Sequence, residues 1–245
     1  ALGKHGKHGP LVRLCAVLAA AVGLGLSSAA EAACRLALAL ALDVSGSVDE
    51  HEYALQMNGI AEALVDDAVQ SAFLDGGAPV NLAIFEWSSS TYQRQILDWR
   101  PIEHVADLRA VRQHLLGWRR APAPEATGIG AALIHAKRLF ETAPPCWAET
   151  LDISGDGKNN DWPIPERLRA EGRLAGMHVN ALVVARDFTS TLALTPEGVT
   201  ELSAYFQTQI IQGPVAFVEV AVGYEDYARA MRRKLLRELA TRPLG

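Results

Sequence analysis

Oxygen-bearing side chains cluster in two short turns of the chain, where they could hold a hard metal ion. Asp43, Ser45 and Ser47 are spaced by two residues, so one carboxylate and two hydroxyls can aim at a common point. Asp156 stands between two glycines in a second turn, and Thr127 offers a further hydroxyl. Such donors suit Mg²⁺ or Ca²⁺ rather than a soft metal. The residue types predict one divalent metal site built from Asp43, Ser45, Ser47, Thr127 and Asp156.

Apolar runs that alternate with amphipathic segments predict the framework that brings these turns together. The runs indicate strands of a buried sheet, and the segments between them indicate crossover helices. We expect strands over residues 36–42, 80–87, 92–99, 150–154, 177–184 and 215–220. We expect helices from residue 49 onward and over residues 105–116, 128–140, 196–207 and 224–239. The pattern predicts a doubly wound, Rossmann-like α/β fold, with helices on both faces of a mostly parallel sheet of about six strands.

Both polar turns directly follow predicted strands. Asp43 comes after the first strand and Asp156 after the fourth, and Thr127 lies just before a predicted helix. Ligands of open α/β sheets bind beyond the carboxyl ends of the strands. We therefore expect the donors to converge at that edge of the sheet. Ordinary helix capping and turn chemistry would explain each residue singly, but not the whole set.

The set resembles the metal-ion-dependent adhesion site (MIDAS) of von Willebrand factor type A domains. The resemblance rests on Asp43-x-Ser45-x-Ser47, on Thr127 with Gly130 three residues later, and on Asp156-Gly157, and it covers roughly residues 34–240. It implies that Ser45 and Ser47 bind the ion directly. Asp43, Asp156 and Thr127 would bind it directly or through water. It also implies Mg²⁺, with Mn²⁺ or Ca²⁺ as alternatives, and a protein partner whose acidic side chain completes the coordination.

A narrower resemblance points to an exported bacterial A-like family, the domain of unknown function 1194. It rests on Glu86-Trp87-Ser88, Ser154-Gly155-Asp156-Gly157, Asn159-Asn160, Gly213-Pro214 and the final Arg232-Arg233-Lys234-Leu235. That family implies the fold and a metal, and no biochemical role.

The first 32 residues have the pattern of a secretory signal peptide. Lys4, Lys7 and Arg13 precede an apolar run over residues 14–26, and Ala30-Glu31-Ala32 supplies a cleavage signature. A retained membrane anchor is the alternative. We expect a signal peptide over residues 1–32 and one A-like domain over residues 33–245, in a periplasmic or secreted protein with no membrane span after cleavage. The net charge of −5 lacks the excess of basic residues that is typical of nucleic-acid-binding proteins.

Cys34 and Cys146 form a candidate disulfide in the exported domain. Cys34 lies nine residues before Asp43, and Cys146 lies ten residues before Asp156. If both Asp residues end adjacent parallel strands, the cysteines lie almost level at the opposite edge, where a bond is geometrically reasonable. The narrower family implies a further cysteine near Gln209, which this chain lacks, so two unpaired thiols remain an alternative.

Three other features are interpreted from the sequence. We expect Glu86 and Trp87 to lie on the rim of the sheet rather than behind the metal site. Asn159 to Asp161 could either orient the metal loop or serve ordinary turn chemistry. The final helix should bury an apolar stripe and expose its basic residues, which are Arg232, Arg233, Lys234 and Arg237.

Taken together, the sequence favours an exported, metal-ion-dependent protein-binding module of the adhesion type over an enzyme. The alternatives are a metal-dependent hydrolase acting through Asp43 or Asp156, and a degenerate structural A domain. The sequence has neither a phosphate-binding P-loop nor the Gly-x-Ser-x-Gly turn of α/β-hydrolases.

Overall fold

The computed structural model describes residues 2–3, 34–185 and 196–240, with side chains from residue 201 onward in the last range. The chain divides into two compact units, Ala1–Glu31 and Ala32–Gly245, and the fold described below is that of the second. The expected signal peptide lies, apart from Leu2 and Gly3, outside the described residues.

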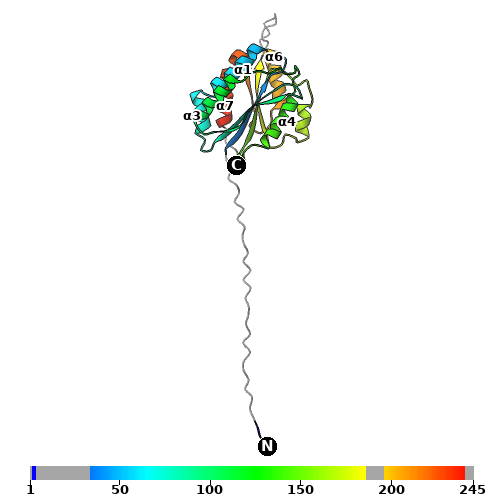
Figure 1. The fold of residues 1–245 in the computed structure, drawn as a ribbon. Coiled ribbons are helices and arrows are strands. Elements are labelled where there is room, and N and C mark those ends of the chain that lie inside the picture. The colour runs from blue at the N-terminus through cyan, green and yellow to red at the C-terminus, as the bar shows by residue number, and fades with distance from the viewer. Residues whose placement is uncertain (1, 4–33, 186–195, 241–245) are drawn as a thin grey trace. The chain divides into compact units, whose positions relative to one another are not determined.

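A six-stranded sheet forms the centre of the domain (Figure 1). Its order is β3-β2-β1-β4-β5-β6, and every neighbouring pair is parallel except β2 and β3. The strands are β1 (Leu36–Asp43), β2 (Val80–Trp87), β3 (Gln93–Ile102), β4 (Glu149–Gly155), β5 (His178–Ala185) and β6 (Val218–Val222). The expected α/β fold with a mostly parallel sheet is confirmed.

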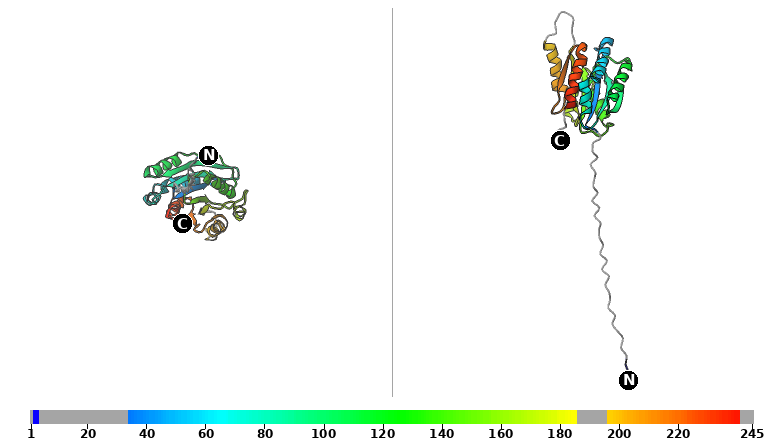
Figure 2. Two further views of the ribbon diagram at one scale, coloured as in Figure 1. Left: turned by 90° about the horizontal axis from the view of Figure 1, so that it is seen from below. Right: turned by 90° about the vertical axis from the view of Figure 1, so that its left-hand side faces the viewer.

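Helices cover both faces of the sheet (Figure 1; Figure 2). In β1, the leucines at alternate positions face a core with α1 (Glu50–Ala63), α2 (Asp67–Leu74), α3 (Val105–Gly117) and α7 (Tyr227–Ala240). The intervening alanines face a second core with α4 (Ile129–Phe140), α5 (Pro165–Ala170), α6 (Pro196–Tyr205) and the π-helical turn η1 (Phe206–Ile210). Successive strand residues point to opposite faces, so the Leu-Ala alternation assigns each layer of helices its own core.

Several boundaries differ from the sequence prediction. The short helices α2 and α5 were not expected, because neither is long enough to show a clear helical period. The final strand begins at Val218 rather than at residue 215. Tyr224 belongs to a short 3-10 turn, η2 (Tyr224–Asp226), that precedes α7. These differences leave the strand ends that carry the metal-site candidates in place.

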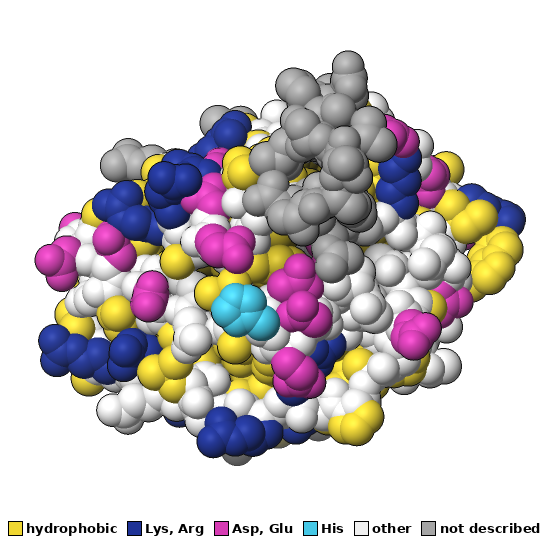
Figure 3. All heavy atoms as spheres, turned by 90° about the horizontal axis from the view of Figure 1, so that it is seen from above, with side chains coloured by type: hydrophobic (Ala, Val, Ile, Leu, Met, Phe, Trp, Pro, Cys, Tyr) yellow, Lys and Arg dark blue, Asp and Glu magenta, His cyan; other side chains and the backbone are white. Residues whose placement is uncertain are grey.

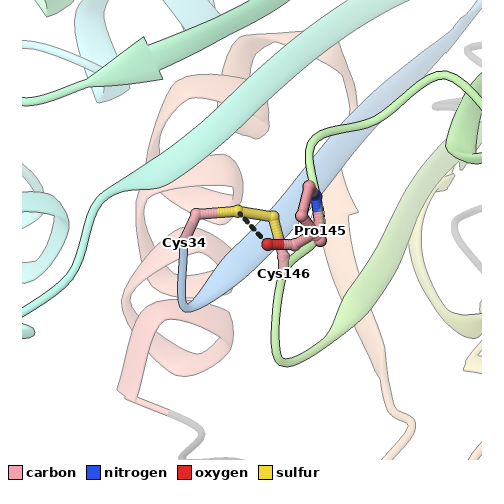
Figure 4. Close-up of a disulfide and its surroundings, with 3 residues drawn as sticks. All are labelled: Cys34, Pro145 and Cys146. Atoms are coloured by element: carbon pink, nitrogen blue, oxygen red, sulfur yellow. Dashed lines mark hydrogen bonds between the residues drawn. A yellow bond between two sulfur atoms is a disulfide. The ribbon is translucent and has the colours of Figure 1, made fainter. Parts of the chain in front are cut away.

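The two cysteines of the described domain are joined by a disulfide at the amino edge of the sheet (Figure 4). Their Cα atoms are 4.5 Å apart, and the backbone N–H of Trp147 donates to the Cys34 carbonyl at 3.0 Å. The Cys34 Sγ lies 3.9 Å from the Pro145 carbonyl oxygen, a contact without a hydrogen bond because a disulfide sulfur carries no hydrogen. The bond fastens the start of β1 to the segment that leads into β4.

Removing this cross-link should destabilise the domain measurably. The bond joins residues 112 positions apart. Closing a loop of that size contributes about 4–5 kcal/mol by restricting the unfolded chain. We expect the Cys34→Ser/Cys146→Ser double variant to lose stability of this order in urea unfolding, and oxidised wild-type domain to show no free thiol when denatured. Equal midpoints for the two proteins would contradict the expectation.

Lys234 on α7 is buried, so the prediction that its side chain is exposed is wrong. Its side chain is 0% exposed and lies between two buried carboxylates. The Nζ atom is 2.8 Å from Asp152 Oδ1 and 2.6 Å from Glu238 Oε1. Glu238 Oε1 also accepts a hydrogen bond of 2.9 Å from the Asn180 amide. An ammonium ion enters a core only where such partners replace its water.

Lys234→Met should lower the free energy of unfolding by about 3–5 kcal/mol near pH 8, because it leaves buried carboxylates without their counter-ion. Burial raises the pKa of Asp152 to about 7 while Lys234 holds it down, so losing Lys234 raises this pKa further. The variant should therefore recover stability as the pH falls and Asp152 takes up a proton.

The matched control is Arg233→Met on the same helix, whose partly exposed ion pair with Glu219 contributes at most about 1 kcal/mol. Equal losses for the two variants in urea unfolding, or a Lys234→Met loss independent of pH, would contradict this account.

Candidate metal centre

Asp43 ends β1 with its side chain fully buried. Its Oδ1 accepts a hydrogen bond of 2.8 Å from the Ser45 backbone N–H, and its carbonyl oxygen accepts one of 3.1 Å from the Gln56 amide. Its Oδ2 is buried and has no hydrogen-bond partner among the residues described. Burial raises the pKa of this carboxyl, while the backbone N–H groups of Ser45 and Asp156, which face it, lower that pKa. A buried carboxylate oxygen is costly unless it is paired, so Asp43 is a candidate ligand for a cation.

Hydrogen bonds link the remaining four candidates into a chain beside Asp43. Thr127 Oγ1 donates to Ser45 Oγ at 3.4 Å, the Ser45 and Ser47 hydroxyls are 3.2 Å apart, and Ser47 Oγ donates to Asp156 Oδ1 at 2.5 Å. Asp156 directly follows β4, which pairs with β1 in parallel. The structure thus brings all five side chains together at the carboxyl edge.

The two carboxylates make the site strongly acidic. Burial, and next the charge of Asp156, raise the pKa of Asp43 to about 7. Burial and the charge of Asp156 also raise the pKa of Tyr224, whose hydroxyl lies 3.4 Å from Asp156 Oδ2. A divalent cation between the carboxylates would remove this repulsion.

The donor set fits such a cation. No group of three or more His, Cys, Asp or Glu side chains suited to a metal ion occurs in the described part of the chain, so this site must rely on hydroxyls beside its two carboxylates. Hydroxyl and carboxylate oxygens are the ligands that Mg²⁺ and Ca²⁺ accept, with water in the remaining positions. The five residues would hold the ion, which would supply positive charge and an open coordination position.

Two asparagines of the turn after β4 hold the segment from Thr127 to Gly130 in place. The Asn160 side chain accepts a hydrogen bond of 2.7 Å from the Thr127 N–H, and the Asn160 N–H donates to the Thr127 carbonyl at 3.0 Å. The Asn159 side chain accepts from the Gly130 N–H at 3.2 Å. A side chain at Gly130 would collide with the Pro163 carbonyl. The sequence left open whether this asparagine turn orients the metal loop or serves ordinary turn chemistry, and these contacts support the first interpretation.

Glu86 is buried behind the site, so the expected rim position is wrong. Its side chain is 0% exposed and accepts hydrogen bonds from the hydroxyls of Tyr53 and Tyr92, from Arg94 and from the Trp118 indole. Trp87, expected beside it on the rim, is also fully buried. Four donors from four segments replace the water that this carboxylate loses. One of them, Tyr53, lies in the helix that follows the Asp43–Ser47 turn.

Gln56 and Tyr224 are further residues of the site that the sequence analysis missed. Gln56 is buried, and it binds the Asp43 carbonyl through its amide N–H and accepts from the Ser154 hydroxyl at 3.3 Å. Tyr224 brings its hydroxyl to Asp156 from the other end of the chain. Both stand at core-facing helical positions, so sequence spacing alone gave no sign of a polar role.

Residues 33–243 match the family described as protein of unknown function DUF1194. The chain belongs to this family. No curated protein matches it.

Several solved structures have a fold similar to that of this chain. Proximal thread matrix protein 1 from the mussel byssus, in a form with a zinc-occupied MIDAS motif, aligns with a TM-score of 0.58 and 16% identity over 86% of this chain and 49% of that one. The pilus adhesin SpaC from Lactobacillus rhamnosus GG aligns at 0.57 and 14% over 84% and 30%.

A von Willebrand factor type A protein from Catenulispora acidiphila aligns at 0.54 and 16% over 84% and 43%. This chain therefore spans less than half the length of each of the three proteins. The likeness shows the fold. This DUF1194 chain has a fold like that of a von Willebrand factor type A domain.

Asn160→Ala should weaken metal binding without unfolding the domain. The variant loses the side-chain acceptor that fixes the Thr127 backbone, and loss of such a supporting contact typically costs about 10- to 100-fold in metal affinity. Mn²⁺ titration by calorimetry measures the effect. Asn58→Ala, on the exposed face of α1, is the matched control and should bind as wild type does. Unchanged affinity in Asn160→Ala would show that Thr127 needs no such support.

Proposed function

We propose that this chain is an exported, metal-ion-dependent protein-binding module. A divalent cation, Mg²⁺ or alternatively Mn²⁺ or Ca²⁺, is held by Asp43, Ser45, Ser47, Thr127 and Asp156. An acidic side chain of a protein partner completes its coordination. The observation that carries the proposal is the buried Asp43 Oδ2, which has no hydrogen-bond partner in the described structure and lies in an oxygen-only cluster with a second carboxylate.

Two relatives support a binding role. One is a thread matrix protein with a zinc-occupied MIDAS motif, and the other is a pilus adhesin. Hydroxyls and backbone N–H groups contact Asp43 and Asp156, and these groups fit metal binding. Such groups are weaker proton-transfer partners than the His or Lys bases used in general acid–base catalysis.

The surface around the site indicates what else the partner should carry. Seen from the end where the parallel strands finish, acidic side chains gather near the middle of the face, and Lys and Arg lie farther out (Figure 3). The acidic residues at the start of α1 and in the loop before Thr127 are Asp49, Glu50, Glu52 and Glu125, of which Glu50 lies 3.7 Å from Arg120. A partner that brings a carboxylate to the metal should therefore surround it with basic residues that pair with this rim.

The proposed location is the periplasm or the extracellular space. The disulfide is stable in oxidising compartments, and residues 1–32 have the pattern of a signal peptide. Across the residues that the structure describes, no helix combines the length and apolar character needed to cross a bilayer.

The direct test is calorimetry of wild type, Asp43→Asn and Asp156→Asn with Mg²⁺, Mn²⁺ and Ca²⁺. We expect wild type to bind one ion and both variants to lose binding. At about 100 times the dissociation constant, the ion should stabilise wild type by about 2.7 kcal/mol and leave the variants unchanged. Asp98→Asn, on the exposed part of β3, is the control. Wild-type affinity in both site variants would refute the site.

Stability in chelator gives an independent readout. Asp43→Asn removes a buried charge beside Asp156 but keeps an oxygen for the Ser45 N–H. We expect this variant to be at least as stable as metal-free wild type, so its loss of binding cannot be ascribed to unfolding.

Partner binding is then measured by capture from envelope extract, which should require the cation and fail for Asp156→Asn. Capture that ignores chelator would contradict a metal-dependent contact.

A further inference from the structure

Trp162 lies exposed in the loop that follows β4, near the proposed metal centre. Its side chain is 61% exposed, more than any other large hydrophobic side chain described in the domain. Tryptophan is highly buried on average, so an indole held in water is unusual. Tryptophans are also enriched among the residues that contribute most to protein–protein binding. The exposed indole is therefore a candidate contact for a partner.

Contacts on both sides of Trp162 hold its backbone in place. The Asp161 carboxylate accepts two hydrogen bonds of 2.7 Å, one from the Trp162 N–H and one from the Ser90 N–H. After Trp162, the Pro163 carbonyl packs against Gly130 so closely that no side chain would fit there. A contact residue whose backbone is already fixed loses less conformational entropy when a partner binds.

The same loop connects Trp162 to the metal site. Asn160, two residues earlier, is hydrogen-bonded to both the N–H and the carbonyl of Thr127. Two residues of chain span at most about 7 Å, so the Trp162 backbone lies within about 7 Å of a residue that contacts a proposed ligand. An extended chain advances about 3.3 Å per residue. A partner segment with a carboxylate on the ion can therefore reach the indole with a side chain a few residues away.

The charges beside the indole determine which side chain it accepts. The Arg167 guanidinium lies 6.0 Å from the centre of the Trp162 ring, so a second cation there would be repelled. Arg167 already has the Glu171 carboxylate at 3.9 Å and creates little demand for another anion. An aromatic side chain can stack on the indole or meet its edge, and it removes apolar surface of both rings from water. The surroundings of Trp162 thus favour an aromatic group.

We propose that the protein partner binds as an extended segment that places an acidic side chain on the metal ion and an aromatic side chain, about two to four residues away, on Trp162. This inference rests on the proposed function, because the carboxylate on the ion sets the register of the segment. The second contact selects among the many acidic segments that an ion alone would accept. A sugar ring could also stack on an indole, but a neutral sugar supplies no carboxylate for the ion.

The test uses the disulfide-bonded domain in saturating Mg²⁺ and a set of synthetic peptides. Each probe is a capped glycine peptide with one aspartate and one phenylalanine, placed two, three or four residues before or after it. The reference peptide carries glycine in place of the phenylalanine. Ligand-observed NMR measures the affinities. Fluorine NMR of domain labelled with 5-fluorotryptophan reports contact at Trp162, whose signal is identified by its loss in Trp162→Ala.

We expect the best phenylalanine peptide to bind about 3- to 10-fold more tightly than the reference peptide, the gain typical of an aromatic pair. It should also shift the fluorine signal of Trp162. Trp162→Ala should lose this gain and keep wild-type Mg²⁺ affinity, since an indole is not a metal ligand. Trp147→Ala is the matched control, because that tryptophan is 52% exposed beside the disulfide at the opposite edge of the sheet. It should keep the gain.

The outcomes separate this inference from the proposed function. If Mg²⁺ binds but phenylalanine adds nothing to peptide affinity, or if Trp162→Ala keeps the gain, this inference is overturned and the metal site stands. If Mg²⁺ does not bind, or if chelator leaves the peptide affinities unchanged, both are overturned. A Trp162 signal that shifts with cellobiose and not with the phenylalanine peptides would overturn the assignment to a protein segment.

Discussion

The parallel pairing of β1 with β4 is the constraint on which the metal centre depends. The register aligns Ala41 with Ile153, so the two strands end side by side, and the carboxylates that follow them meet at one edge. Burial and mutual repulsion oppose having both carboxylates ionised, which is why the pKa of Asp43 is raised. A divalent cation is the simplest group that can satisfy both carboxylates and the free Oδ2 together.

The side chains of the proposed metal site are held by contacts that are themselves buried and polar. Asn160 fixes the backbone at Thr127, Gln56 bridges Asp43 to Ser154, and Glu86 ties the first turns of α1 to β3 and to the end of α3. Metal ligands need this support, because small displacements of hydroxyl oxygens cost much of the affinity. The two apolar cores hold the helices against the sheet, and the polar contacts hold the loops of the proposed metal site.

The fold could be predicted from sequence, and the five proposed metal ligands could be named from it, because both rest on local patterns. The Leu-Ala alternation of β1 and the spacing of Asp43, Ser45 and Ser47 are visible without any tertiary information. Lys234, Glu86 and Tyr224 could not be placed in the same way. A lysine that directly follows the exposed Arg233 cannot be distinguished from a solvated one until Asp152 of β4 is known to contact it. Polar burial depends on partners far along the chain, and hydropathy patterns do not record those partners.

The central claim is that one divalent ion lies between Asp43, Ser45, Ser47, Thr127 and Asp156. Its most direct test is a crystal structure of the oxidised domain grown with Mn²⁺, with diffraction recorded near the manganese absorption edge. The account predicts a single strong anomalous peak at the carboxyl edge, with the Ser45 and Ser47 hydroxyls among its ligands. A domain with Mn²⁺ bound elsewhere, and with these five side chains in contact only with water and one another, would contradict it.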